Sequence, residues 1–506
     1  MKYLSFIIVL AFAVSCTDLT PVLYSDLTTA NAYSTESDID AALVGVYADL
    51  TPGAGDSYLY RAGYYVTLGD YASDMGYTDY GGDISKMGPS LYDPNNRYFS
   101  SNWSSMYKTI ADANTLLSKI DQVDMDETKK RQIIGQARFL RALAYLDASD
   151  GWGPIPLITE PLNPTETYDY PLSPVSEVDA LIIEDCMYAN DNLPAEWAPE
   201  LGLARATKGA AATILAKVYS RAHDYTNAMK YIDEVIQSPV YQLNPDFKDV
   251  FSGYNRLDMG GIFSILHESA INGGEITNHF CARDLPEVPN RWGYYAVALE
   301  FWRNYDDADP RKQFFYYNYE GAATRDETTT HGFYWMMPEP GQSNPPNDTT
   351  KLMQNICTQK YSYEMIEQSY LDSRTNYVFR LADVILLKAE AMNETSGPSA
   401  ALPYVNQIRE RAGAPLYGDA GFPVPASKEE MAEKILAERG FELVFEYMRR
   451  SDLIRFGKYV EYTNAYLQEA GINNTVTEGM IHFPYPLTES YLNEEMAAAN
   501  AGRYSN

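Results

Sequence analysis

The chain has 506 residues, of which 39 are Lys or Arg and 69 are Asp or Glu, so its formal net charge at pH 7 is −30. A surface this acidic repels phosphate backbones and anionic lipid head groups, which excludes nucleic acid as a partner. Hydrophobic residues make up 45% of the chain, enough for a sizeable core, whereas its four scattered cysteines indicate neither a disulfide framework nor a thiolate metal site.

The N-terminus predicts a secretory signal peptide over residues 1–15, because one Lys is followed by an apolar run over residues 3–14 and a small residue. The run is far shorter than the roughly 20 residues that a membrane-spanning helix needs. Residues 13–16, Ala-Val-Ser-Cys, look like a bacterial lipobox. We therefore expect Cys16 to be the acylated N-terminus of the mature protein, with residues 16–33 as lipidated N-terminus and tether. An ordinary signal peptide with a chance cysteine is the alternative.

Three helices are expected next along the chain. Ser37 and Asp38 precede an apolar pattern that predicts a capped helix ending at Pro52-Gly53. The stretch 53–100 is rich in Gly, Tyr and Asp and has little helical period. Residues 102–120 and 127–148 show the period of strong amphipathic helices.

An internal repeat is the clearest signal of architecture. It has the offsets of tetratricopeptide helix-turn-helix units, with Ala216, Tyr219, Ala228, Ile232 and Val235 in one copy and Ala389, Met392, Ala401, Val405 and Ile408 in the other. Small Ala side chains let paired helices approach closely, and Pro239 or Pro415 follows each unit. Because each unit buries its apolar face on neighbours, we expect about four helix pairs: a mainly α, tetratricopeptide-like scaffold.

Between the two copies, residues 241–376 have no sustained helical period and are dense in Gly, Pro and aromatic residues. Loops of this length are functional or disordered, and a solvated coil would expose the aromatic rings at a cost. We expect an irregular, loop-rich lobe with short strands, carried on the helices.

Glu438, Glu442 and Glu446 lie at i, i+4 and i+8 and precede Arg449 and other cations. A glycosidase needs two carboxyls facing each other across a cleft, about 5 to 10 Å apart, whereas these three share one side of a helix. The spacing therefore favours a structural ion-pair network.

Four segments, together with Cys16, resemble the SusD/RagB outer-membrane lipoproteins of Bacteroidetes. They are Ala137–Tyr145 running into Gly151–Leu157, Arg380–Ala391, Ile435–Glu446 and Arg449–Arg455. Departures from the family pattern, such as Gly440 in place of an Arg and Pro484-Tyr485-Pro486 in place of Pro-Ile-Pro, lie in framework segments.

The resemblance implies a single domain over residues 34–506, with a helical scaffold at 34–240 and 377–506 and a ligand-binding lobe at about 241–376. It implies a protein at the cell surface, anchored to the outer membrane by its lipid, which binds glycan without catalysis. It also implies a partner, a SusC-like TonB-dependent transporter that takes up the ligand.

Aromatic residues in loops are the best candidates for ligand contact, because flat rings stack on sugar faces and loops on a rigid scaffold concentrate binding residues. We predict ligand contacts from Tyr77, Tyr80, Trp292, Tyr294, Tyr295, Tyr334 and Trp335, with hydroxyl hydrogen bonds to Asp74 and Asn290. A hydrophobic core of the lobe is the competing interpretation for Trp292 and Trp335.

The sequence predicts no catalytic residue, metal or cofactor. The five His residues lack metal-ligand spacing, and the Gly-rich segments lack the Lys of a phosphate-binding loop. Asp70, Asp74, Asp79 and Asp83 miss the spacing of a calcium loop and are interpreted as solvated acids. Peptide capture, as by a RagB-like protein, a lipid-anchored glycoside hydrolase and a scaffold that binds only partner proteins remain open as alternatives.

Overall fold

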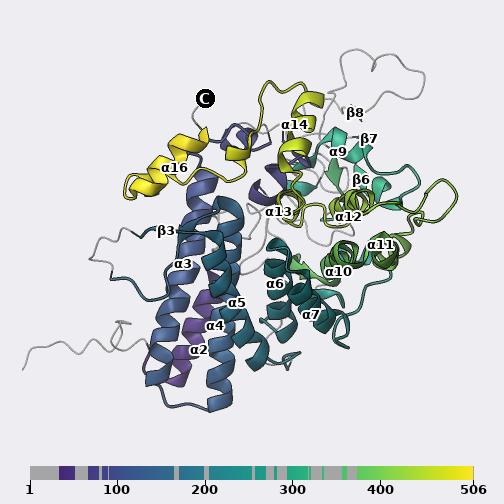
Figure 1. The fold of residues 1–506 in the computed structure, drawn as a ribbon. Coiled ribbons are helices and arrows are strands. Elements are labelled where there is room, and N and C mark those ends of the chain that lie inside the picture. The colour runs from purple at the N-terminus through teal and green to yellow at the C-terminus, as the bar shows by residue number, and fades with distance from the viewer. Residues whose placement is uncertain are drawn as a thin grey trace, which may run out of the picture.

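The computed structural model is mainly helical, and its long helices pack in chain order (Figure 1). It describes residues 33–51, 67–78, 82–88, 90–163, 170–198, 204–252, 257–268, 279–281, 293, 295–316, 318–320, 333–335, 356–361 and 373–504. The long helices of the first half are α2 (Glu36–Ala48), α3 (Arg97–Lys119), α4 (Glu127–Trp152), α5 (Val175–Asn192), α6 (Lys208–Arg221) and α7 (Tyr225–Ile236). Those of the second half are α10 (Leu381–Ser396), α11 (Pro398–Ala412), α12 (Lys428–Glu442), α13 (Arg449–Arg455), α14 (Tyr459–Glu469) and α16 (Glu494–Tyr504), and the short helices are α9 (Leu299–Arg303) and α15 (Leu487–Ser490).

The predicted repeat is confirmed as two helix-turn-helix units, α6 with α7 and α10 with α11. Ala216, Ala228, Ala389 and Ala401 are all fully buried, as expected of small residues between close-packed helices. The units adjoin because α10 also packs on α7, and α4 and α5 continue the stack on the other side of α6. The tetratricopeptide-like helical scaffold is therefore confirmed.

The ends of the first helices differ from the prediction. The N-cap of α2 is Thr35, whose hydroxyl accepts from the backbone N–H of Asp38 while the Asp38 carboxylate accepts from that of Thr35. These two reciprocal hydrogen bonds make Thr35 the N-cap, and the predicted cap residue Ser37 lies inside the helix. Helix α3 begins five residues earlier than predicted because Asn96 caps it, and α4 continues to Trp152.

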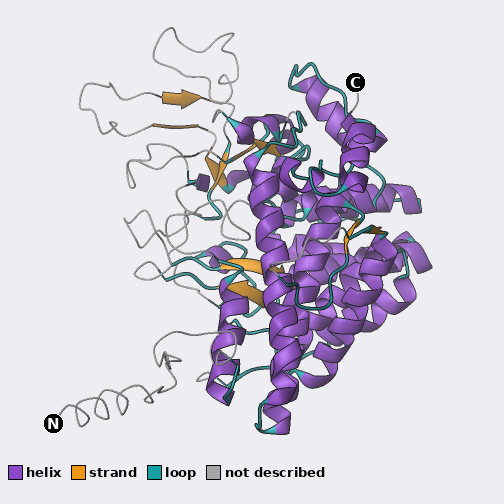
Figure 2. Cartoon of the chain, turned by 90° about the vertical axis from the view of Figure 1, so that its left-hand side faces the viewer, coloured by secondary structure: helices purple, strands orange, loops and turns teal. Residues whose placement is uncertain are grey.

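The strands are short and pair in twos. They are β1 (Gly76–Tyr77) with β5 (Ala296–Val297), β2 (Ile155–Pro156) with β3 (Leu172–Ser173), β4 (Gly261–Ile265) with β10 (Asn376–Arg380), β6 (Phe315–Tyr316) with β9 (Cys357–Thr358), and β7 (Asn318–Glu320) with β8 (Phe333–Trp335). Figure 2 shows most of them along one side of the helical body. This side carries the irregular segment between the two repeats.

One hydrophobic core joins the helices to this side of the molecule. It runs without a break from Ile39 in α2 through Tyr295 and Phe301 to Met496 in α16. Within the described ranges, no helix combines the length and the hydropathy needed to span a membrane.

Candidate functional site

Strands β1 and β5 bring together two of the segments in which ligand contacts are predicted. Tyr77 lies opposite Ala296 and Gly76 opposite Val297 in an antiparallel pair. The hydroxyl of Tyr71 accepts a hydrogen bond from the Ala296 backbone N–H at 2.6 Å, which adds a third tie between the two segments. The half-buried Tyr77 is thereby held across from the chain that immediately follows residues 292–295.

Glycines allow the segment 67–78 to lie this close to its neighbours. A Cβ at Gly76 would come within 2.6 Å of the Tyr71 Cα, and one at Gly69 within 2.6 Å of the Tyr447 carbonyl oxygen. Real Cβ atoms do not approach backbone this closely, so both positions require glycine.

Two buried aspartates fix the base of this segment on the C-terminal half of the chain. The Asp70 carboxylate accepts from the backbone N–H groups of Tyr447 at 2.8 Å and Arg449 at 3.0 Å. The Asp74 carboxylate accepts hydrogen bonds from Nε and Nη2 of Arg449 at 2.8 and 2.7 Å, which makes a bidentate ion pair. Burial raises the pKa of Asp70 to about 7, even though the two backbone N–H groups favour its ionised form.

These contacts correct the interpretation of Asp70 and Asp74 as solvated acids, since their residues are 0% and 7% exposed. Asp74 was also predicted to hydrogen-bond ligand hydroxyls, but both of its oxygens are occupied by Arg449. Its partner, Arg449, lies 375 residues away in the sequence, so no local sequence pattern predicts this pair.

Tyr295 is only 2% exposed and belongs to the core beneath the site. Its ring stacks on His279 with centroids 4.7 Å apart and meets the edges of Tyr71 and Phe280. The structure therefore gives Tyr295 a packing role in place of the predicted surface contact.

The other predicted residues are less fully placed. Tyr334 and Trp335 lie in β8, opposite Tyr319 and Asn318 of β7. Tyr80, Asn290, Trp292 and Tyr294, like Cys16, lie outside the described residues. Their proposed roles in ligand contact and lipidation stay predictions.

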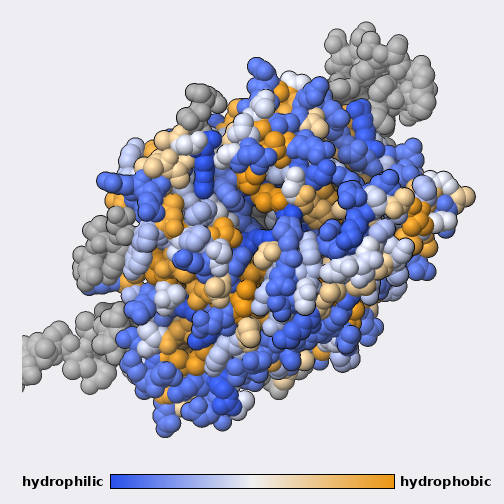
Figure 3. Space-filling view, viewed as in Figure 1, coloured by the Kyte–Doolittle hydropathy of each residue, from blue (hydrophilic) through white to orange (hydrophobic). Residues whose placement is uncertain are grey.

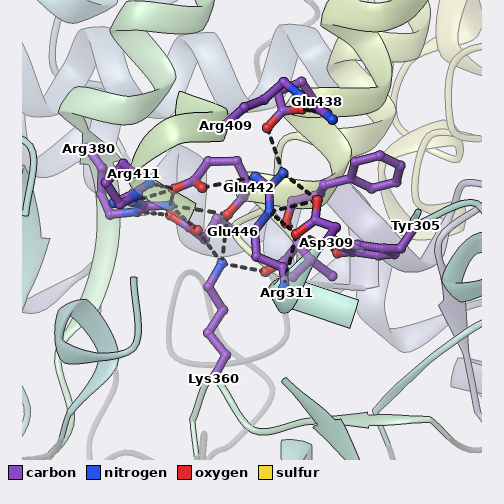
Figure 4. A network of polar contacts seen from close by, with 12 residues as sticks. Tyr305, Asp309, Arg311, Lys360, Arg380, Arg409, Arg411, Glu438, Glu442 and Glu446 are labelled. Atoms are coloured by element: carbon purple, nitrogen blue, oxygen red, sulfur yellow. Dashed lines mark hydrogen bonds and ion pairs between the residues drawn. The ribbon is translucent and has the colours of Figure 1, made fainter. Parts of the chain in front are cut away.

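A buried ionic network lies behind the site, and it confirms the prediction for the three glutamates (Figure 4). Glu438 pairs with Arg311 at 2.7 Å and Arg409 at 2.9 Å. Glu442 pairs with Arg411, Arg380 and Arg311, and Glu446 with Arg380 and Lys360. Every one of the three carboxylates thus faces guanidinium or ammonium groups.

The network joins the irregular segment to the scaffold, because Arg311 and Lys360 come from that segment and Glu442 ends α12. Burial alone would raise the pKa of Glu442, but Arg411, Arg380 and Arg311 hold it at about 2. Burial lowers the pKa of Lys360 to about 8 despite the nearby Glu446. Glu442 is therefore ionised at neutral pH and serves as the anchor of the network.

The described part of the chain contains no group of three or more His, Cys, Asp or Glu residues arranged to hold a metal ion. Cys186, Cys281 and Cys357 are buried and form no disulfide with one another. Among the described residues, the groups around the site are aromatic rings, hydroxyls and paired charges.

Two family models match complementary parts of the chain. Residues 291–497 match the model described as SusD family, and residues 24–220 match one described as starch-binding associating with outer membrane. The chain is 28% identical over 487 residues to SusD-like protein P2 of Formosa agariphila, with 90% of each chain covered. It is 23% identical over 436 residues to the starch-binding protein SusD of Bacteroides thetaiotaomicron, covering 76% of this chain and 74% of that one.

Solved structures share the fold. A SusD homologue from Bacteroides thetaiotaomicron has a TM-score of 0.73 at 22% identity, covering 92% of this chain and 97% of that chain. Surface glycan-binding protein A of the same organism, solved in complex with laminarihexaose, has a TM-score of 0.69 at 19% identity, covering 90% and 97%. Together with the helical scaffold and the motifs now placed on it, these matches show that the chain belongs to the SusD/RagB family.

Proposed function

We propose that this protein is a surface lipoprotein that binds glycan through its loop-rich lobe and delivers it to a SusC-like TonB-dependent transporter in the outer membrane. Membership of the family supports the proposal, as do relatives named for starch, laminarin or glycan binding. Lipidation at Cys16 would hold the folded body at the membrane surface.

The pairing of β1 with β5 is the structural observation that supports this proposal most directly. It holds Tyr77 opposite Ala296, and the sequence places the predicted contacts Tyr80, Trp292 and Tyr294 within four residues of this pair. Aromatic faces on a rigid base suit stacking against sugar rings, with adjacent polar groups for the hydroxyls. The base is rigid because Asp70, Asp74 and Arg449 are buried and fully engaged.

The ion pairs of the described carboxylates fit a protein that binds glycan without hydrolysing it. Glycoside hydrolysis requires one carboxyl to donate a proton and a second to act as base or nucleophile. Among the described residues, the most conspicuous carboxylate cluster, Glu438, Glu442 and Glu446, is locked in ion pairs with cations.

A polysaccharide panel that includes laminarin and starch tests this function. We expect stoichiometric binding of at least one polysaccharide with no release of reducing ends, and weaker binding by Tyr77→Ala and Trp292→Ala. Tyr491→Ala is the matched control, because it removes the same ring from a position between α15 and α16 that is 77% exposed. Sustained release of reducing ends would show an enzyme, and retention of unstructured peptides in place of glycans would show peptide capture.

Anchoring is tested separately with Cys16→Ala. The variant should fold and bind the same polysaccharide, yet leave the outer-membrane fraction when expressed without its partner transporter. If it still fractionates with the membrane by itself, the lipobox interpretation is wrong.

A further inference from the structure

A cavity of about 210 Å³ lies on the scaffold between α4, α6 and α13. It is lined by Leu146, Ser149 and Asp150 of α4, Lys217 and Arg221 of α6, and Ser451, Ile454 and Arg455 of α13, with Val175, His223 and His482 at its edges. Figure 3 shows a hollow near the centre of this face, bordered by hydrophilic side chains. A smaller pocket of about 30 Å³ shares Leu146, Asp150, Lys217 and Ser451 with this cavity and is also lined by Arg450.

Three of the residues that line this cavity are cations, in a chain that carries a net charge of −30. Lys217, Arg221 and Arg455 line it, whereas Asp150 is its one lining carboxylate. The other carboxylates that pair with these cations are Asp179, Asp383, Glu390 and Asp452, and none of the four lines the cavity. The cations therefore stand between the cavity and the acids that balance them.

Arg221 has a hydrogen-bonding capacity that its partners do not use. Its Nη1 donates to Ser149 at 3.0 Å and to Asp150 at 2.5 Å, and its Nη2 donates to Asp179. Its Nε is buried and makes no hydrogen bond. The Arg221 side chain is nevertheless 20% exposed and lines the cavity, so an anion bound there would lie beside its positive charge.

His482, which also lines the cavity, interacts with three guanidinium groups. Burial, Arg450, Arg503 and Arg221 together lower the pKa of His482 to about 3, so this ring is neutral at physiological pH. A nearby positive field disfavours protonation of imidazole and favours a bound anion.

The volume restricts the size of that anion. Since a water molecule occupies about 30 Å³ in the liquid, the cavity suits one compact group with a few waters. Pockets for drug-sized ligands begin at about 300 Å³. We propose that this cavity between α4, α6 and α13 binds a small oxyanion, a carboxylate or sulfate, either free in solution or as the charged substituent of an acidic sugar.

Calorimetric titration of the purified full chain tests this site independently of the proposed glycan function, because its first probe is sodium sulfate. The titration is run at constant ionic strength set with sodium chloride, so general salt screening does not contribute. Glucuronate and glucose follow as second and third probes. We expect sulfate or glucuronate to bind at one site per chain and glucose not to bind there.

The decisive variants are His223→Asp and His223→Asn. His223 lies at the cavity edge with φ +56°, a conformation that Asp and Asn tolerate, so the two variants differ essentially in one charge at the same place. We expect His223→Asp to weaken anion binding by about tenfold or more, equivalent to about 1.4 kcal/mol, and His223→Asn to retain it. Arg221→Gln should weaken it as strongly, while Lys108→Gln, which removes a 60% exposed cation from α3, should leave it unchanged.

Each outcome decides the proposal. Binding of sulfate and glucuronate assigns the site to oxyanions in general, and binding of glucuronate alone assigns it to acidic sugars. Failure of both anions to bind above the chloride background overturns the proposal. Equal binding by wild type and His223→Asp overturns it as well, because the anion would then occupy another place.

Discussion

Asp70 and Asp74 lie four residues apart in the same short segment, yet their carboxylates do different work. Asp74 neutralises a guanidinium, whereas Asp70 accepts only backbone N–H groups and receives no direct cation in the described contacts. Asp74 therefore forms an ion pair, whereas Asp70 forms hydrogen bonds to the backbone. The two aspartates therefore respond differently to substitution and to pH.

Asp74→Ala should destabilise the protein by about 3–5 kcal/mol, because it leaves the Arg449 guanidinium buried without its bidentate partner. Urea unfolding followed by circular dichroism measures the loss. Lys208→Ala breaks the pair with Glu234, whose side chains are 45% and 29% exposed, and it should cost no more than about 1 kcal/mol. Equal losses in the two variants would contradict a structural role for the Asp74 pair.

Asp70→Asn should flatten part of the dependence of stability on pH. The pKa of Asp70 is raised from 3.8 to about 7 in the folded protein, so between these values the folded state binds more protons than the unfolded state. Asp70 thus contributes stability that is lost as pH rises through this window, by up to about 1.4 kcal/mol per pH unit. His482, whose pKa is lowered to about 3, acts with the opposite sign, so the informative quantity is the difference in unfolding free energy between wild type and variant at pH 4.5 and 7.5. A constant difference across that range would refute the role of Asp70.

Helices and strands differ in how far the sequence reveals them. The repeat around Ala216 and Ala389 and the helices α3 and α4 follow from spacing alone, because their apolar faces recur within each segment. The cap of α2 was misplaced because Thr35, Ser37 and Asp38 are all good capping residues and only the folded backbone selects Thr35.

The pairing of β1 with β5 could not be predicted, because each strand has only two residues and the pair joins Gly76 with Val297 and Tyr77 with Ala296, which lie far apart in the sequence. Such short strands carry no period of their own. The cations that pair with Asp74 and Glu442 could not be predicted either, because charge complementarity does not specify which distant cation a carboxylate meets. Aromatic loops could be predicted as candidates, but the packing of Tyr295 on His279 could not.

Thr35→Ala and Ser37→Ala separate the two possible caps of α2. Thr35→Ala removes the hydroxyl that accepts from Asp38 and should cost about 1 kcal/mol. Ser37 is an exposed position within the helix, where Ala has the higher helical propensity, so Ser37→Ala should be neutral or slightly stabilising. Thermal unfolding of both variants measures the difference, and the reverse order would restore the cap predicted from the sequence.

At the scale of the whole molecule, the ionic network and the continuous core make one body of segments that are far apart in the chain. Arg311 and Lys360 belong to the irregular segment, while Glu438 and Glu442 belong to α12 and Arg409 and Arg411 to α11. Unfolding the lobe would strip these carboxylates of their partners. We therefore expect scaffold and lobe to unfold in one transition.

Acid should weaken this junction first. The pKa of Glu442 is lowered from 4.5 to about 2 in the folded protein, so its contribution to stability is full above pH 4.5 and is lost as pH falls toward 2. Glu442→Gln should be less stable at pH 7 and show a shallower loss between pH 4.5 and 2.5. Glu461→Gln, at a side chain that is 64% exposed, should follow the wild-type curve. An unchanged acid slope in Glu442→Gln would contradict the role of Glu442 as anchor.

The division of labour at the β1–β5 site has a consequence for how such a protein can diversify. The groups that set the position of the loops, Asp70, Asp74, Arg449 and the two glycines Gly69 and Gly76, are all inside the body of the protein. Under the proposed function, substitutions in the aromatic segments that flank β1 and β5 can therefore change which ligand is preferred without loss of these buried anchoring groups.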